Sequence, residues 1–262
     1  MSTSATPREF SVERDGGVLR ISWDRPDALN ALTGEMVLGT AAAIEAAADD
    51  PAVRVVVVAG RGPAFSAGAD LEEVNPDQPI GEATLDAANR LIRAIRAVPK
   101  PVVAAVHGPA AGFGASIALS ADITLAASSA YFLLAFAHVG LMPDGGSTAL
   151  VPASVGRARA TRLAMLGERV DAATAFDWGL ITKATSDEDF PAELANLTAK
   201  LEAGPTAAYA RIKQALDTTA LSALEPALEV EKEGQLALFE SHDFAEGTRA
   251  FREKRKPRFV GA

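Results

Sequence analysis

The stretch VVAAVHGPAAGFGASIALSADITLA, residues 102–126, decides the fold of this chain. Its first five residues are a short, continuous apolar run, which is typical of a strand buried on both faces. A glycine-rich turn follows at 107–114, then a helix of small residues to about 121, then a strand at 123–126. Strand, helix and strand at this spacing favour parallel pairing, so the sequence predicts an α/β domain.

The segments before this stretch extend the same pattern. Two β-rich runs flank a glycine-containing turn at residues 10–23, which predicts a hairpin. Thr33 is a suitable N-cap for an alanine-rich helix that runs to Asp50. The run VRVVVVA at 53–59 predicts another strand buried on both faces, and a helix follows at 85–97.

The last hundred residues are expected to be almost wholly helical. We therefore divide the chain into a core at 1–195, which carries the active site, and a helical region at 196–262. The first eight residues are expected to form a disordered leader. The helices predicted after the core strands lie at 157–166, 171–178, 190–203, 206–217 and 224–241.

Composition excludes several classes of protein. There is no Cys among the 262 residues, and the three His are not spaced as ligands, so no metal site is predicted. A net charge of −9 disfavours binding to nucleic acid or to an anionic membrane. The N-terminus lacks an apolar signal segment and no apolar run could span a bilayer, so a cytoplasmic protein is expected.

Three turns carry the candidate chemistry, at 65–71 (FSAGADL), 108–114 (GPAAGFG) and 140–147 (GLMPDGGS). Small residues let a ligand approach the backbone, and a helix N-terminus offers free N–H donors to an anion. Each turn is expected at the C-terminal side of a strand, where ligands of parallel sheets collect. Read singly, such turns are mostly connectors, and Asp144 could simply cap the next helix.

Four motifs in register resemble the crotonase (enoyl-CoA hydratase/isomerase) superfamily. RPDALNAL at 25–32 resembles the family's RPxxxNAL motif, and 65–71 resembles its FxAGADL loop. The turn at 108–114 resembles the family's second glycine-rich turn, and FREKRKPRF at 251–259 resembles its C-terminal FxEKRKPxF signature. The similarity spans essentially the whole chain. It implies a spiral of ββα units, followed by C-terminal helices that form a homotrimer or a dimer of trimers.

The resemblance also implies an acyl-CoA substrate and a set of site residues. Coenzyme A is then part of the substrate, and no separate cofactor is expected. The thioester oxygen would sit in an oxyanion hole made by the backbone N–H groups of Ala69 and Phe113, and Phe113 would narrow the space near the acyl chain. Phe251 and Lys254 would reach the coenzyme A of a neighbouring subunit. The family's nucleotide contacts carry over to Asp27, Ala28, Leu29, Ala67, Asp70 and Leu71, with Asp27 and Glu72 standing where a Lys often helps with phosphates.

The acid/base positions favour a double-bond shift. The family's hydratases use two Glu, which align here with Ser116 and Phe136, whereas Asp144 aligns with the single acid of the Δ3,Δ2-enoyl-CoA isomerases and of the ring-isomerising enzyme of phenylacetate breakdown. One base suffices to move a proton between C2 and C4. Apolar neighbours such as Leu141 and Met142 would raise the pKa of Asp144. The alternatives are a hydratase, an aryl-CoA dehalogenase with Asp144 as nucleophile, and a non-catalytic acyl-CoA binder.

Overall fold

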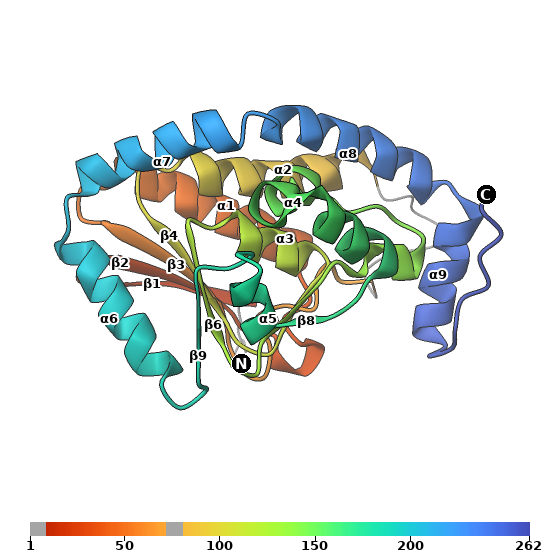
Figure 1. The fold of residues 1–262 in the computed structure, drawn as a ribbon, viewed down its shortest axis with the longest axis horizontal. Helices are drawn as coiled ribbons and strands as arrows, with labels where there is room; N and C mark the ends of the chain where they lie inside the picture. Colours follow the sequence, from red (N-terminus) through yellow and green to blue (C-terminus); the bar gives the residue numbers. More distant parts are fainter. Residues whose placement is uncertain (1–8, 72–80) are drawn as a thin grey trace, which may run out of the picture.

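The computed structural model describes residues 9–71 and 81–262, so the leader at 1–8 and Glu72 lie outside the described residues. A six-stranded sheet has the order β1-β2-β3-β4-β6-β9 (Figure 1). The first pair is an antiparallel hairpin and every later pair is parallel, which confirms both predictions. The strands are β1 (Phe10–Asp15), β2 (Val18–Trp23), β3 (Val55–Gly60), β4 (Val102–Val106), β6 (Ile123–Ala127) and β9 (Lys183–Thr185).

The central strands are buried on both faces, as their composition predicts. Alternate side chains of β3 point to opposite sides, because the side-chain period of a strand is two residues. Val55 and Val57 belong to a cluster with Leu194 and Leu201 of α6 (Phe190–Ala203). The intervening valines face the larger core, which contains α1 (Gly34–Asp49) and α2 (Glu82–Ala97).

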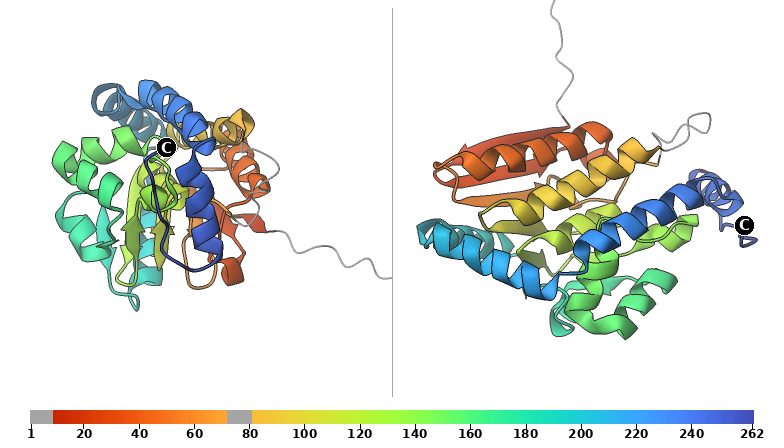
Figure 2. Two further views of the ribbon diagram at one scale, coloured as in Figure 1. Left: turned by 90° about the vertical axis from the view of Figure 1, so that its right-hand side faces the viewer. Right: turned by 90° about the horizontal axis from the view of Figure 1, so that it is seen from above.

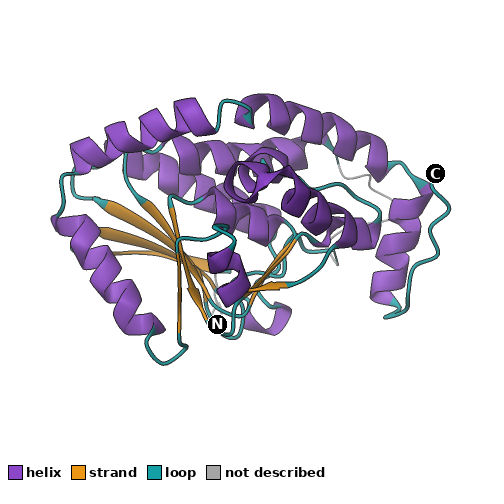
Figure 3. Cartoon of the chain, viewed as in Figure 1, coloured by secondary structure: helices purple, strands orange, loops and turns teal. Residues whose placement is uncertain are grey.

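The spiral is built from units that place one strand in each of two sheets. After β4 the chain adds β5 (Pro109–Ala111) to a small sheet and then forms α3 (Phe113–Ser120). After β6 it adds β7 (Tyr131–Leu133) and then the 3-10 helix η2 (Ala135–Val139). The small sheet has the order β5-β7-β8, and Figure 3 shows its strands apart from those of the large sheet. This arrangement confirms the predicted α/β fold class.

The C-terminal helices pack back onto the core of the same chain. Figure 2 shows α8 alongside α2, and Arg93 of α2 pairs with Glu225 and Glu229 of α8. The predicted division between residues 195 and 196 falls within α6. The helices of this region are α7 (Thr206–Ala220), α8 (Leu224–Phe239) and α9 (His242–Arg252), and the last lies outside the helical ranges predicted from the sequence.

The helix predicted at 157–166 is longer than expected. It is the second half of α4 (Ser147–Leu166), which bends at Gly156, where φ is 76° and ψ is 160°. Between α4 and β9 lie β8 (Val170–Asp171) and α5 (Ala172–Asp177). Within the described ranges every helix is too short or too polar to cross a membrane.

Asn30 locks the turn between β2 and α1, so the Asn30→Ala variant is expected to be less stable. Its side chain is fully buried, accepts a bond from the N–H of Arg25 and donates to the carbonyls of Arg61 and Ala64. Loss of these bonds, at a residue with φ of 54°, should lower the free energy of unfolding by about 2–4 kcal/mol. Urea denaturation would measure this.

A matched control for that variant is Leu29→Ala. Leu29 also has a positive φ, of 50°, but its side chain is 42% exposed. We expect its free energy of unfolding to change by less than about 1 kcal/mol. Equal losses in the two variants would contradict the role of the Asn30 amide.

Candidate active site

Two glycine-containing turns lie against each other at the N-terminus of α3. Gly68 has φ of 99° and Gly112 has φ of 51°. A Cβ on Gly68 would lie 2.8 Å from the carbonyl oxygen of Ala111, so the two backbones are in direct contact. In the described part of the chain, the N–H groups of Ala69 and Phe113 have no acceptor. The structure thus places two free donors on adjoining turns, the second at a helix N-terminus.

The first of these turns is held against the RPDALNAL segment. The Ser66 hydroxyl, which is fully buried, donates to the carbonyl of Asn30 and accepts from the N–H of Gly68. The N–H of Leu32 donates to the carbonyl of Gly68 at 2.8 Å. These bonds leave the Ala69 donor on a rigid backbone, which is what a preorganised oxyanion hole requires.

The predicted nucleotide contacts form one edge, along which Asp27, Leu29 and Ala67 are exposed. Asp27 and Ala28 lie in the 3-10 helix η1 (Pro26–Ala28), and the carbonyl of Leu29 accepts from the N–H of Ala67 at 2.9 Å. The carboxylate of Asp70 pairs with Arg25 at 2.8 Å. The structure therefore brings the segments 27–29 and 67–71 together, while their binding of coenzyme A stays a prediction.

The C-terminal end of α9 lies beside the same edge. Arg252 donates to the carbonyl of Leu71 at 3.1 Å within the one chain. Phe251 is 56% exposed, and Lys254 is exposed with φ of 53°. Contact between these two residues and a neighbouring subunit's coenzyme A stays a prediction.

Asp144 lies in the loop between η2 and α4. This third turn therefore follows a 3-10 helix, and the prediction that it follows a strand was wrong. The hydroxyls of Ser116 and Ser147 each donate to the main-chain carbonyl of Asp144 at 2.8 Å. The N-cap of α4 is Gly146, without a side-chain cap, so Asp144 does not cap that helix.

Two polar side chains of α8 hold this loop, and neither was predicted from the sequence. The carboxylate of Glu231 accepts from the N–H of Gly146 at 2.7 Å, and from the N–H and the hydroxyl of Thr148 at 2.8 and 2.6 Å. The amide of Gln235 donates through Nε2 to Oδ2 of Asp144 at 2.8 Å. Both α8 side chains are 1% exposed.

A signal for them exists in the sequence. Residues 224, 228, 231 and 235 recur at helical spacing, and all four are buried. The first two are Leu and the last two are polar. Polar residues on the buried stripe of a helix need partners in the core, which indicates a functional or structural network.

The carboxyl group of Asp144 is enclosed although the residue as a whole is only half-buried. Its Oδ1 is buried and has no hydrogen-bond partner within the described residues. Burial raises the pKa of Asp144 to about 7; the Gln235 bond opposes the rise and the charge of Glu231 adds to it. Burial also raises the pKa of Glu231. A carboxyl with a pKa near neutrality can both accept and return a proton at physiological pH.

Apolar groups pack around this carboxyl-bearing loop. A Cβ on Gly145 would lie 2.8 Å from the ring of Phe113, and one on Gly234 of α8 would lie 2.2 Å from Sδ of Met142. At the two positions expected to carry Glu in hydratases, Ser116 is fully buried and Phe136 is 7% exposed, and neither side chain has a carboxyl group. Glu231 is a second carboxylate near the site, but both of its oxygens already accept bonds from the loop.

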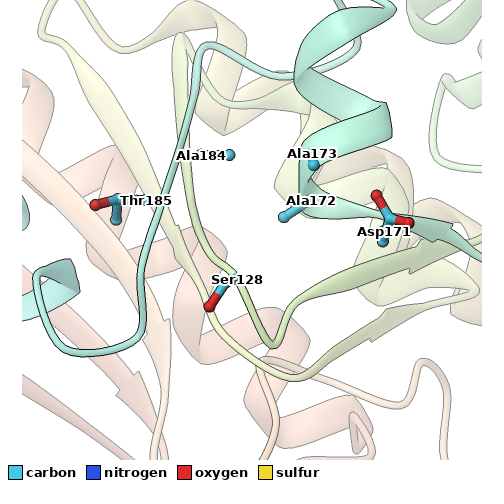
Figure 4. Close-up of a pocket in the computed structure, with 6 residues that line it drawn as sticks. All are labelled: Ser128, Asp171, Ala172, Ala173, Ala184 and Thr185. Carbon is cyan, nitrogen blue, oxygen red and sulfur yellow. The ribbon is translucent and has the colours of Figure 1, made fainter.

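A pocket of about 270 Å³ lies elsewhere, at the turn after β6 and the start of α5 (Figure 4). None of the candidate catalytic or coenzyme A-binding residues lines this pocket. No group of three His, Asp or Glu side chains suited to a metal ion occurs within residues 9–71 and 81–262. The residues that line the pocket are Ser128, Asp171, Ala172, Ala173, Ala184 and Thr185.

With this geometry in place, comparison with known proteins defines the class. A family described as Enoyl-CoA hydratase/isomerase matches residues 13–262, and the chain belongs to this family, the crotonase superfamily. It is therefore an enzyme of the type that acts on acyl-CoA.

Some relatives of the chain are named as isomerases and others as hydratases. The chain is 38% identical to 1,2-epoxyphenylacetyl-CoA isomerase of Escherichia coli, over 94% of this chain and 95% of that protein. It is 41% identical to a probable enoyl-CoA hydratase of Rhodobacter capsulatus, with the same coverage. The crystal structure of an enoyl-CoA hydratase from Mycobacterium avium subsp. paratuberculosis superimposes with a TM-score of 0.90 at 46% identity, covering 96% of this chain and 98% of that one.

Proposed function

We propose that this enzyme shifts a double bond in an unsaturated acyl-CoA, with Asp144 as the proton shuttle. The observation that carries the proposal is the single available carboxyl oxygen at the site, Oδ1 of Asp144, which is buried and without a partner in the described chain. The pKa of its carboxyl group, about 7, suits a group that must first take a proton and then return it.

The reaction would proceed in two proton-transfer steps. Asp144 takes a proton from C2 of a 3-enoyl thioester, and the electron pair is delocalised as a dienolate whose negative charge rests on the thioester oxygen. The N–H groups of Ala69 and Phe113 stabilise that oxygen. Protonated Asp144 then returns the proton at C4, which leaves the double bond between C2 and C3.

Hydration is disfavoured by the same geometry. The hydratase scheme needs a second carboxyl group to activate a water molecule. Ser116 and Phe136 occupy the two positions where that scheme places Glu, and Glu231 is engaged by three donors of the loop. The relative named as an isomerase supports this choice, and the relative named as a probable hydratase supplies the competing hypothesis.

Wild-type enzyme is expected to convert 3-hexenoyl-CoA into the conjugated 2-enoyl-CoA and to stop there. The ultraviolet absorbance of the conjugated thioester would rise and then hold steady, because Glu231, the other carboxylate at this loop, is held by Gly146 and Thr148 and would not activate water. The control is 2-hexenoyl-CoA added directly, which should persist. Its consumption would establish a hydratase instead, while no turnover alongside tight binding of a CoA ester by calorimetry would establish a non-catalytic binder.

Membership of the family also supports a proposal about binding partners. We propose that coenzyme A lies along the edge formed by 27–29 and 67–71, and that the chain assembles as a homotrimer or a dimer of trimers. Exposed apolar side chains on α7 and α8 support an assembly through these helices. They are Ile212, Leu216 and Val230, which are 54%, 60% and 62% exposed.

A further inference from the structure

Packing alone does not explain why a polar residue, Gln235, is buried at this position. It lies on the buried stripe of α8, after Leu224 and Leu228, and is 1% exposed. Its single hydrogen bond is the one from Nε2 to Oδ2 of Asp144, and its Oε1 is buried with no partner in the described chain. Burying an amide with half of its bonds unmade is unfavourable, and a leucine would fill the same space without that loss.

The bond distinguishes the two oxygens of the Asp144 carboxyl. Oδ2 is occupied by the Gln235 donor, whereas Oδ1 has no partner. We infer that Gln235 is a positioning residue, which fixes Oδ2 as an acceptor and so assigns the moving proton to Oδ1. The inference rests on the proposed function of Asp144 as the shuttle, and it makes α8 part of the active site rather than only a cover for the core.

Glu231, one turn earlier on α8, completes the arrangement. Within the described residues, the negative charge of Glu231 raises the pKa of Asp144. The Glu231 carboxylate is held in place by bonds from Gly146 and Thr148. From α3, the groups that face the loop are the apolar ring of Phe113 and the hydroxyl of Ser116, neither of which is charged. The negative charge of Glu231 and the donor of Gln235 therefore act on the same carboxyl in opposite directions.

The test is the pH profile of a pair of variants. Gln235→Met keeps the length of the side chain and removes the donor, so ionised Asp144 loses a charge-assisted bond and the acid limb of kcat/KM should move to higher pH. At pH 6 we expect kcat/KM of Gln235→Met to be about tenfold lower than that of wild type. At pH 9, where Asp144 is ionised in both proteins, the difference should be much smaller. Glu231→Gln removes the negative charge and should move the acid limb to lower pH.

A matched control is Glu233→Gln, which removes a charge from the exposed side of the same helix. Its profile should coincide with that of wild type. If Gln235 only filled space, Gln235→Met would change kcat/KM by the same factor at every pH. That outcome, or a Gln235→Met profile that coincides with wild type, would overturn the inference.

A titration without substrate separates this inference from the proposed function. The carboxyl of Asp144 can be followed by carbon-13 NMR of protein labelled at Asp, with the signal assigned by its loss in Asp144→Asn. We expect the midpoint to lie higher in Gln235→Met than in wild type. If wild type fails to isomerise 3-hexenoyl-CoA and the midpoint still shifts, the proposed function fails and the positioning role stands. An unshifted midpoint overturns the positioning role whatever the activity.

Discussion

The Asp144→Asn variant is expected to lose about 10³-fold in kcat for the conversion of 3-hexenoyl-CoA, because a positioned acid/base contributes roughly 10²- to 10⁴-fold. Asn has the same shape, and its side-chain oxygen can still accept the bond from Gln235, so the loop should keep its conformation. KM should change little, since the variant retains the backbone donors. Steady-state kinetics in the same absorbance assay would measure both quantities.

The pH profile of the wild type tests the same carboxyl. In the proposed reaction Asp144 must be ionised to take the C2 proton, and its pKa is about 7, so kcat/KM should fall about tenfold per pH unit below that value. The control for charge removal is Asp177→Asn, on the exposed end of α5, which should match wild type. Comparable kcat values for Asp144→Asn and wild type would remove Asp144 as the base.

The Gly68→Ala variant is expected to lower kcat by about 10²- to 10³-fold, the usual effect of losing one oxyanion donor. Gly68 has φ of 99°, which disfavours any side chain, and the new Cβ would meet the carbonyl oxygen of Ala111 at 2.8 Å. The turn must therefore shift, and the N–H of Ala69 moves with it. The measurement is kcat together with a thermal unfolding curve, which shows whether the fold survives.

Gly34→Ala is the matched control for that substitution. Gly34 begins α1, and a Cβ there would meet nothing within 4 Å, so kcat and stability should both be retained. A folded Gly68→Ala protein with wild-type kcat would contradict the assignment of Ala69 to the oxyanion hole.

The parts of the fold that sequence predicts are those with a strong local signal. The run of valines in β3 has no polar interruption, so it predicts a buried strand, and Thr33 caps α1 with a bond from the N–H of Met36, as expected. Strands of two or three residues, such as β5 and β8, are too short to show a period. The first half of α4 was not predicted, because Pro152 and Gly156 are residues that usually interrupt a helix. The chain is nevertheless helical from Ser147 onward.

In the candidate site, too, some residues were predictable from the sequence and others were not. The turns that hold Ala69, Phe113 and Asp144 are recognisable from their glycines and from the family motifs. Glu231 and Gln235 were not predicted, since each is 83 residues or more from its partners in the chain and only tertiary packing brings them together. Long-range contacts of this kind carry no periodicity, so the polar residues on the buried stripe of α8 are the one clue that sequence offers.

The enclosed carboxyl of Asp144 also links the proposed catalysis to the stability of the fold. In the native state this group holds its proton up to a pH of about 7, whereas in an unfolded chain it would release it near its ordinary value of 3.8. The native state therefore binds more protons across that interval, and this group's contribution to the free energy of unfolding is greatest in acid and is lost as the pH rises through about 7. In the proposed reaction Asp144 acts as a base only where its ionised form opposes folding, so the remainder of the core must hold the loop closed against that charge.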